Sequence, residues 1–187
     1  MRTRSVPLAV LALILAANLL AACGDGGDIT IEGEGGTLDG VRLEDTAVAS
    51  NGGNLSIDGI GGAYGVYVSY YAGLRSGGGD IIVHGEGGTA AGTFLTGGID
   101  SAGGDIDVYG YSTAAEGLVL NSGYIDGVTS AGGDIRLEGH GATGGALLVG
   151  SGSGANSIDS AGGAITIIGS ASAADAVGVL LSNLAVV

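Results

Sequence analysis

Basic residues are scarce in this chain of 187 residues. Lysine is absent, and five arginines stand against nineteen aspartates and glutamates, which gives a formal charge of −14. Nucleic-acid binding depends on Lys and Arg side chains that neutralise phosphates, and attraction to anionic lipid headgroups needs the same charges. The composition therefore predicts no nucleic-acid partner and repulsion from an anionic membrane surface.

Long apolar runs are also missing. The residues from Leu8 to Ala17 form an unbroken apolar run of ten, preceded by Arg2 and Arg4 and followed by Asn18. A helix that crosses a bilayer needs about 17 to 25 mostly apolar residues. A short positive head before a short apolar stretch is typical of a secretory signal peptide. We therefore predict a helical signal peptide over residues 1–22 rather than a membrane-spanning helix.

Cysteine occurs once, at Cys23, directly after this segment. The sequence Leu20-Ala21-Ala22-Cys23 resembles the lipobox of bacterial lipoproteins. That resemblance implies cleavage by signal peptidase II between Ala22 and Cys23, and lipid attachment to Cys23. Residues 23–27 would then be a lipidated N-terminus and short tether, and the membrane a partner through the lipid. The alternative is an ordinary secretory signal with an incidental cysteine.

The expected location follows from the same resemblance. In lipoproteins of diderm bacteria an aspartate after the cysteine often signals retention in the inner membrane, whereas this chain has Gly24. The cell envelope is therefore the predicted compartment, with the outer membrane or cell surface favoured. After cleavage, three arginines would remain against nineteen acidic residues, a formal charge of −16.

Glycine is abundant, with 42 residues, and it recurs at a fixed period. A Gly-Gly-Asp motif or a close variant begins at residues 26, 52, 78, 103, 132 and 162, so the spacings are 26, 26, 25, 29 and 30. Each motif opens a stretch in which apolar and polar residues alternate, the pattern of a half-buried strand. A regular repeat of this length indicates a solenoid rather than a disordered glycine-rich chain.

The alternation assigns each position of the repeat to a side. The predicted inward positions are apolar in all six repeats: Ile29/Ile31, Leu55/Ile57, Ile81/Val83, Ile106/Val108, Ile135/Leu137 and Ile165/Ile167. The predicted outward positions are mostly polar: Thr30/Glu32, Ser56/Asp58, Ile82/His84, Asp107/Tyr109, Arg136/Glu138 and Thr166/Ile168.

Two further strands are expected in each repeat. The second begins at Gly40, Gly65, Gly92, Gly117, Gly145 and Gly178, and a third, shorter one contains Leu74, Ile99, Ile125 and Ile158. Three strands in each repeat predict an all-β fold, a right-handed parallel β-helix of about six coils over residues 28–187, preceded by the signal-peptide helix. Glycine suits the corners because positive φ carries little cost there.

The repeats GGDIxI, GVxL and SAGGDI resemble those of filamentous haemagglutinin-like and autotransporter-like surface adhesins. This resemblance implies a structural or adhesive role. The chain departs from the pattern by its lipobox and its small number of repeats. Its apolar C-terminal sequence LLSNLAVV lacks a polar cap, so an open β-edge is predicted there, through which the protein would self-associate.

Parallel β-helices also include polysaccharide lyases and hydrolases, which leaves an enzymatic alternative open. Asp58 and His84 would lie on adjacent coils, while His140 falls in a different register, and Arg136 would pair with Asp107. Varied polar residues at solvated strand positions account for these side chains equally well. We therefore predict no catalytic site and no cofactor, and keep a polysaccharide-active or carbohydrate-binding protein as the alternative.

Two sets of residues remain as candidate ligand sites. The acids Asp100, Asp126 and Asp159 precede three of the turns and are the candidate Ca²⁺ ligands, although the sequence lacks the Ca²⁺-binding nonapeptide pattern and no metal site is predicted. A second set of acids directly follows the glycines of the GGDIxI motifs, where the side chains can instead bond turn amides: Asp28, Asp80, Asp105 and Asp134. Tyr64, Tyr67, Tyr70 and Tyr71 are the one aromatic cluster, and they either form a patch for a surface glycan or pad a strand face.

Overall fold

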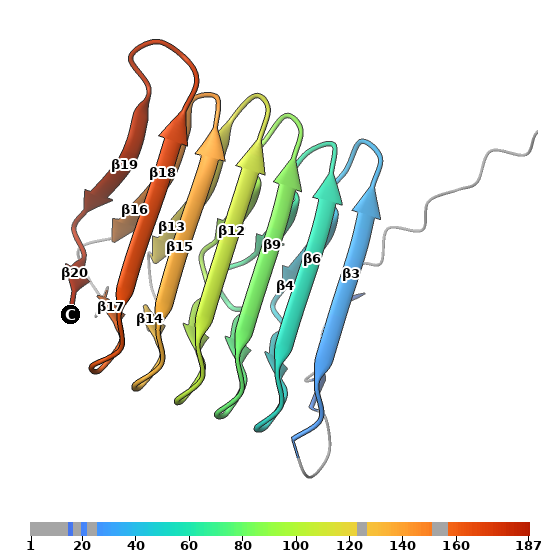
Figure 1. Ribbon diagram of the computed structural model, residues 1–187. Coiled ribbons are helices and arrows are strands. Elements are labelled where there is room, and N and C mark those ends of the chain that lie inside the picture. Colours follow the sequence, from blue (N-terminus) through green and yellow to red (C-terminus); the bar gives the residue numbers. More distant parts are fainter. Residues whose placement is uncertain (1–14, 17–19, 22–25, 123–126, 151–156) are drawn as a thin grey trace, which may run out of the picture.

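The chain forms a β-solenoid built from three parallel sheets, according to a computed structural model. The structure describes residues 15–16, 20–21, 26–122, 127–150 and 157–187. Strands that are about one repeat apart in sequence are neighbours in each sheet, so the chain winds round one axis and advances by one strand spacing in each coil (Figure 1). This confirms the predicted all-β solenoid of about six coils.

The first sheet, here called the GGD sheet, contains the strands that follow the Gly-Gly-Asp motifs. Its outer strands are β3 and β18, and all six pair in parallel, coil after coil. The strands are β3 (Ile29–Gly35), β6 (Leu55–Gly61), β9 (Ile81–Gly87), β12 (Ile106–Ser112), β15 (Ile135–Gly141) and β18 (Ile165–Ala171).

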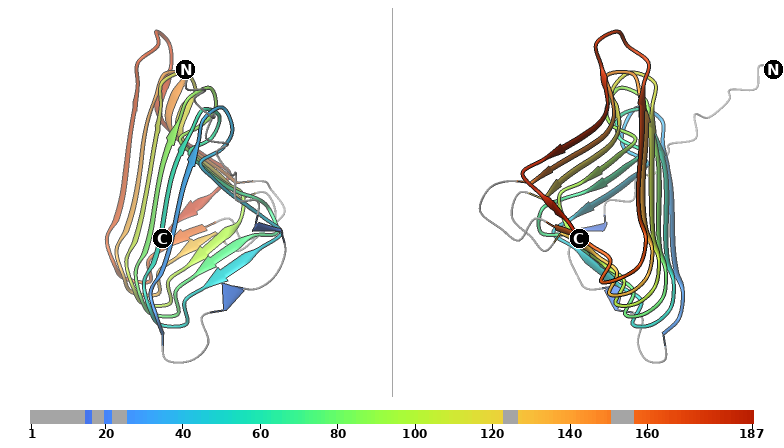
Figure 2. Two further views of the ribbon diagram at one scale, coloured as in Figure 1. Left: turned by 90° about the vertical axis from the view of Figure 1, so that its right-hand side faces the viewer. Right: turned by 60° about the vertical axis from the view of Figure 1, so that its left-hand side comes forward.

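The other two sheets complete each coil, and the views along the axis show the coils superposed around a three-sided cross-section (Figure 2). The middle sheet contains β1 (Leu15–Ala16), β4 (Val41–Glu44), β7 (Val66–Val68), β10 (Thr93–Leu95), β13 (Glu116–Ser122), β16 (Gly144–Gly150) and β19 (Val177–Ser182). The short sheet contains β2 (Leu20–Ala21), β5 (Ala47–Ala49), β8 (Gly73–Arg75), β11 (Gly98–Asp100), β14 (Val128–Thr129), β17 (Ser157–Asp159) and β20 (Ala185–Val186).

The core is a stack of aliphatic side chains from all three sheets. In the GGD sheet the predicted inward positions are buried in the interior coils, with Leu55, Ile57 and Val83 fully inaccessible to solvent. The alternation of buried and exposed side chains follows from the strand geometry, which turns successive side chains to opposite faces. Equivalent positions are paired in register, for example Ile57 with Val83, so each buried residue packs on its counterparts in the neighbouring coils.

A column of buried serines joins the short sheet to the GGD sheet. The hydroxyl group of Ser101 is shared between two carbonyl oxygens. One is that of Gly104 in its own coil, at 2.5 Å, and the other is that of Ser130 in the next coil, at 3.3 Å. The same arrangement recurs at Ser50 and Ser130. These hydrogen bonds satisfy carbonyl groups that would otherwise lose hydration inside the corner. The Ser-Ala-Gly-Gly pattern therefore has a structural function.

The aspartates of the Gly-Gly-Asp motifs form a second ladder between coils. Asp80 Oδ1 accepts the backbone N–H of Asp105 at 2.9 Å, and Asp105 Oδ1 accepts that of Asp134 at 2.8 Å. The carboxylate of each coil thus binds the equivalent residue in the following coil, rather than an amide of its own turn. Asn54 serves as acceptor in the second coil, and Asp134 bonds the N–H of Ala164, which has no acceptor side chain.

Glycine is required where coils and sheets approach most closely. A Cβ atom added to Gly110 would lie 2.1 Å from the carbonyl oxygen of Gly117, a distance that real side chains do not tolerate. At the turns, Gly103 has a φ of 128° and the preceding Ala102 a φ of 55°, so the predicted positive-φ corners are confirmed. Steric exclusion thus accounts for much of the glycine content.

One prediction from the sequence is corrected by the structure, and another falls mostly outside the described residues. The third strand of the fourth coil is not at Ile125: Val128 pairs with Ile99 and with Ile158, and it is completely buried. Ile125 lies outside the described residues, as does most of the predicted signal-peptide helix. The four described residues of that segment form β1 and β2, which pair with β4 and β5. No helix in the described part of the chain has the length and apolarity to span a membrane.

The close approach of the backbones at Gly110 and Gly117 leads to a prediction about stability. Gly110→Ala is expected to lower the free energy of unfolding by at least about 1–3 kcal/mol, because the added methyl group forces the backbone apart. Gly73→Ala is the matched control, since its Cβ would lie 3.8 Å from the nearest atom, the carbonyl oxygen of Gly98. Guanidinium unfolding followed by circular dichroism measures both. Equal stability of the two variants would contradict the steric requirement for glycine.

Candidate functional site

The outer face of the GGD sheet carries the acid–histidine pair anticipated from the sequence. Strand pairing places Asp58 beside His84, and His84 Nδ1 lies 3.3 Å from Asp58 Oδ2. The His84 ring also packs on Tyr109 of the next coil, with 4.9 Å between the ring centroids. These side chains line a shallow hollow of about 400 Å³. Because Asp58 and His84 are 49% and 36% exposed, solvent screens their interaction strongly.

Arg136 lies on the same face and is held by two carboxylates. It contacts Asp107 of the preceding coil at 3.3 Å, as expected, and also forms an ion pair with Glu138 on its own strand. Glu138 in turn bonds His140 Nε2 at 2.6 Å. His140 aligns with Tyr111, two residues along the strand from the position that aligns with His84. The expected difference in register between the two histidines is therefore confirmed. The one arginine of this face is thus already paired with acidic residues.

The four tyrosines of the predicted aromatic cluster separate into two groups, and the first is a stacked column on the middle sheet. Tyr67 pairs with Arg42 on one neighbouring strand and with Phe94 on the other. The Arg42 guanidinium lies 4.2 Å from the Tyr67 ring centroid, and the Phe94 ring stacks on Tyr67 at 5.5 Å with 4° between the planes. Because β7 lies between β4 and β10, both faces of the Tyr67 ring are covered by protein.

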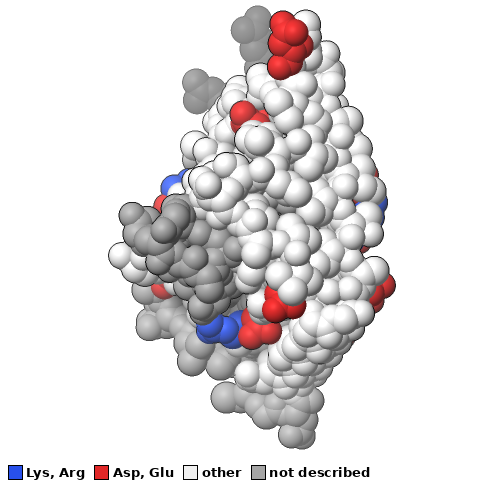
Figure 3. All heavy atoms as spheres, turned by 90° about the vertical axis from the view of Figure 1, so that its left-hand side faces the viewer, with Lys and Arg blue, Asp and Glu red and all other residues white. Residues whose placement is uncertain are grey.

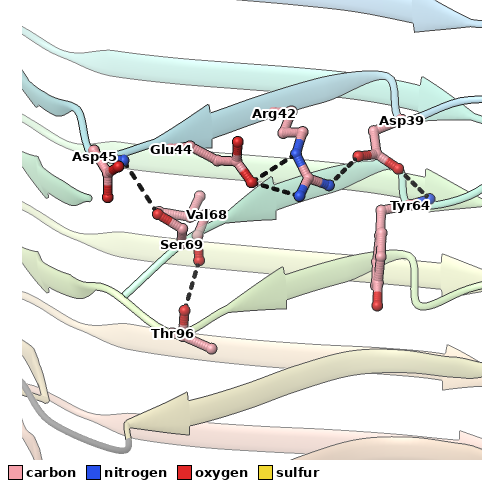
Figure 4. Close-up of polar contacts among 8 residues, drawn as sticks. All are labelled: Asp39, Arg42, Glu44, Asp45, Tyr64, Val68, Ser69 and Thr96. Atoms are coloured by element: carbon pink, nitrogen blue, oxygen red, sulfur yellow. Dashed lines mark hydrogen bonds and ion pairs between the residues drawn. The ribbon is translucent and has the colours of Figure 1, made fainter. Parts of the chain in front are cut away.

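Arg42 is fixed in place by carboxylates at each end (Figure 4). Its Nη1 donates to Asp39 at 2.7 Å, and its Nε donates to Glu44 at 2.9 Å. The hydrogen bond to Glu44 raises the pKa of Arg42 above its usual range, with Asp39 adding to the effect. Asp39 also accepts the backbone N–H of Tyr64, whose ring packs at 5.3 Å on Tyr67. This cluster is therefore internally satisfied, and the sequence reasoning missed both Arg42 and Phe94 as members.

Tyr70 and Tyr71 form the second group, at the corner between β7 and β8. Their rings meet edge to face at 4.3 Å, and Tyr71 is 72% exposed. Tyr71 borders a hollow of about 240 Å³ on the outside of the short sheet, which Arg75, Asp100 and Thr129 also line. Here an exposed aromatic ring lies next to a cation, a carboxylate and a hydroxyl group. Together these groups could contact a small polar ligand.

The acids proposed as Ca²⁺ ligands are not aligned. Strand pairing places Thr129 between Asp100 and Asp159, so Asp126 does not occupy the equivalent position and itself lies outside the described residues. Asp100 Oδ1 accepts the backbone N–H of Ala102 at 3.0 Å, and Asp159 does the same for Ala161. These carboxylates support turns in which the alanine has positive φ. Within the described residues, no group of three His, Cys, Asp or Glu side chains is placed to hold a metal ion.

The lipid-attachment site of the sequence analysis, Cys23 with Ala22, lies outside the described residues. Comparison of the chain with models of protein families, with curated proteins and with solved structures gives no match. The function is therefore inferred from the repeat, the surface chemistry and the predicted signal peptide.

The two possible roles of Asp100 lead to different results on mutation. If Asp100 supports its turn, Asp100→Ala lowers the free energy of unfolding by about 1 kcal/mol, whereas Asp100→Asn keeps an acceptor and loses less than about half of that. Added Ca²⁺ leaves the thermal midpoint of all three proteins unchanged. A Ca²⁺-dependent rise of the wild-type midpoint, lost in Asp100→Asn, would instead establish a calcium ligand.

Proposed function

We propose that this protein is a lipid-anchored β-solenoid of the cell envelope with a structural or adhesive role and no catalytic activity. The observation that carries the proposal is the lipobox sequence ending at Cys23, directly before a rigid repeat scaffold. Ile29, the first residue of β3, is the sixth residue after Cys23. A fully extended segment of that length spans about 20 Å. The scaffold would therefore be held close to the membrane.

The surface of the solenoid supports a role in presentation rather than catalysis. General acid–base catalysis requires positioned groups whose protonation is tuned to the reaction. Asp58 and His84 are half-exposed on an open sheet face, and Arg136 is paired with Asp107 and Glu138. Parallel coils instead provide long, rigid columns of outward side chains, which suit repeated contacts with a partner surface.

The anchor is tested by changing the cysteine alone. Wild type expressed in a diderm host is expected to partition into detergent, with a mass increase from acyl chains on Cys23, because several buried chains hold a protein at a membrane. Cys23→Ala is expected to lose both properties, and Cys23→Ser provides a polar control. Mature wild-type protein without a lipid adduct would refute the anchored lipoprotein and leave a secreted solenoid.

A second candidate function, binding of a surface glycan, is favoured by the hollow beside Tyr71. An exposed aromatic ring offers a face to a sugar, and Arg75, Asp100 and Thr129 offer hydrogen-bonding groups around it. Tyr67 suits this role less well, because Arg42 and Phe94 cover its two faces. Acidic polysaccharides would meet repulsion from the net charge, so neutral glycans are the better probes.

Titration with neutral oligosaccharides tests this candidate. Tyr71→Ala is expected to weaken binding by about tenfold, the loss of one aromatic contact. Tyr67→Ala is the matched control and is expected to change the affinity by less than about twofold. Saturable binding that is lost in Tyr67→Ala and kept in Tyr71→Ala would move the site to the middle sheet, and absence of any binding would remove the candidate.

A further inference from the structure

The C-terminal coil exposes side chains that are buried in every interior coil. Val179 and Leu181 are 39% and 48% exposed, although their counterparts Ala146 and Leu148 in the preceding coil are fully buried. Among the described residues, no strand pairs with the outer edge of β18, β19 or β20. Uncharged atoms occupy most of this end of the solenoid (Figure 3).

This end also lacks the usual protection of an exposed sheet edge. Natural edge strands are commonly blocked by charged side chains, proline or bulges. From residue 160 onward the chain has one charged residue, Asp175, and no proline. On the GGD sheet, Ile168 occupies an outward position that is polar in the other five coils, and it is exposed here, as is Leu180 on the middle sheet. The C-terminal coil is therefore suited to pairing with another strand layer.

Gly178 lacks the close contact that its interior counterparts make with the following coil. A Cβ added at Gly145 would lie 2.2 Å from Gly178 O in the following coil, and at the four earlier glycines of this column a Cβ would lie 2.1–2.4 Å from a backbone nitrogen of the following coil. At Gly178 the nearest atom is Gly169 O, at 2.9 Å and in its own coil. The severe conflict with a following coil, which requires glycine elsewhere in the column, is absent here.

Gly27, at the opposite end of the solenoid, lacks the close contact that its counterparts make with the preceding coil. In this column a Cβ would meet backbone of the preceding coil, at 2.1–2.5 Å for each of the five later glycines. These are Gly53, Gly79, Gly104, Gly133 and Gly163. At Gly27 no atom lies within 4 Å. One end thus carries a glycine suited to a coil that follows it, and the other end a glycine suited to a coil that precedes it.

We propose that mature copies of this chain associate head to tail, with the C-terminal coil of one copy stacked on the N-terminal coil of the next. By the repeat geometry, β3, β4 and β5 of one copy continue the sheets that end at β18, β19 and β20 of the other. Gly178 then faces the backbone at Gly33, and Gly27 faces the backbone at Gly163. The contact rests on the proposed removal of the leader, because β1 and β2 pair with the outer edges of β4 and β5.

A second copy fits this end by length, side-chain pattern and charge. The strands β3 and β18 each have seven residues, and Ile29, Ile31 and Gly33 repeat the pattern of Ile165, Ile167 and Gly169. Residues 28–45 carry six acids and Arg42, whereas the C-terminal coil carries only Asp175. Head-to-head contact would oppose two acidic coils, and tail-to-tail contact would leave Gly27 without a close neighbour. Head-to-tail contact avoids both problems.

Ala164 supplies a way to strengthen the contact. The side-chain ladder that runs from Asp28 to Asp134 ends at Ala164, which receives a hydrogen bond but offers no acceptor. In the stacked arrangement its side chain would face the backbone N–H of Asp28 in the next copy. Asparagine already fills this position at Asn54, where Oδ1 accepts the N–H of Asp80 at 2.9 Å. Ala164→Asn therefore adds one hydrogen bond to the junction without adding charge.

Sedimentation velocity of residues 23–187 carrying Cys23→Ser tests the proposal without any lipid. This segment contains β3 to β20, which supply the whole described core. A heterologous contact that does not close predicts a series of oligomers that grows with concentration. Gly27→Ala is expected to weaken association by more than about tenfold because of overpacking. Ala164→Asn is expected to tighten it about fivefold, the effect of one net hydrogen bond.

Two controls separate the junction from the fold. Gly73→Ala, in an interior coil with free space around it, is expected to match the parent protein in association. Gly27→Ala is expected to keep the thermal midpoint of the dilute monomer. A monomer at all concentrations, or a closed dimer that is insensitive to Gly27→Ala, would overturn the proposal. Lipidation of Cys23 is read separately by mass spectrometry, so failure of the anchor and failure of the association are distinguishable.

Discussion

The structure depends on the stacking of nearly identical coils at the spacing of hydrogen-bonded strands. That spacing brings the backbones of successive coils together at the corners, as at Gly79 and Gly104, so a Cβ is excluded there. The same spacing places each buried aliphatic residue on its counterparts in the neighbouring coils and lets Ser101 bond across to the next coil. The abundance of glycine, the aliphatic columns and the buried serines thus have a common origin in the distance between coils.

The outer faces follow from the same geometry. Outward residues of successive coils meet directly, so chemistry that is scattered in the sequence becomes continuous on the surface. Arg42, Tyr67 and Phe94 come from three coils and form one stacked column. Asp58, His84 and Tyr109 form another. In both columns the side chains use much of their surface to contact side chains of the neighbouring coils. The exposed ring of Tyr71, at a corner, is more available to a ligand.

The two ends of the solenoid differ in charge and in exposure. The N-terminal coil is acidic and lies next to the proposed anchor, whereas the C-terminal coil is almost uncharged and leaves inward-facing positions such as Leu181 in contact with solvent. A repeat protein needs atypical terminal coils to end its stack. Ala164 interrupts the aspartate ladder, whereas the inward columns keep aliphatic residues in the C-terminal coil, such as Ile167, Val179 and Leu181. With the anchor and the head-to-tail contact that we propose, such ends would arrange copies in rows.

The sequence by itself determined the strands of the GGD sheet and of the middle sheet and which of their residues face the core, because apolar residues with a period of two match the alternation of side chains along a half-buried strand. Of the short sheet it located only the strands at Leu74, Ile99 and Ile158. It also indicated the adjacency of Asp58 with His84 and of Asp107 with Arg136, since alignment of the Gly-Gly-Asp motifs sets the register of the strands that follow them. Only the tertiary structure decided where the longer repeats place their extra residues. The pairing of Val128 with Ile99 puts Thr129, not Asp126, beside Asp100. It likewise decided that Phe94 and Arg42 cover Tyr67, because the orientation of aromatic rings across coils depends on side-chain packing that a linear pattern does not record.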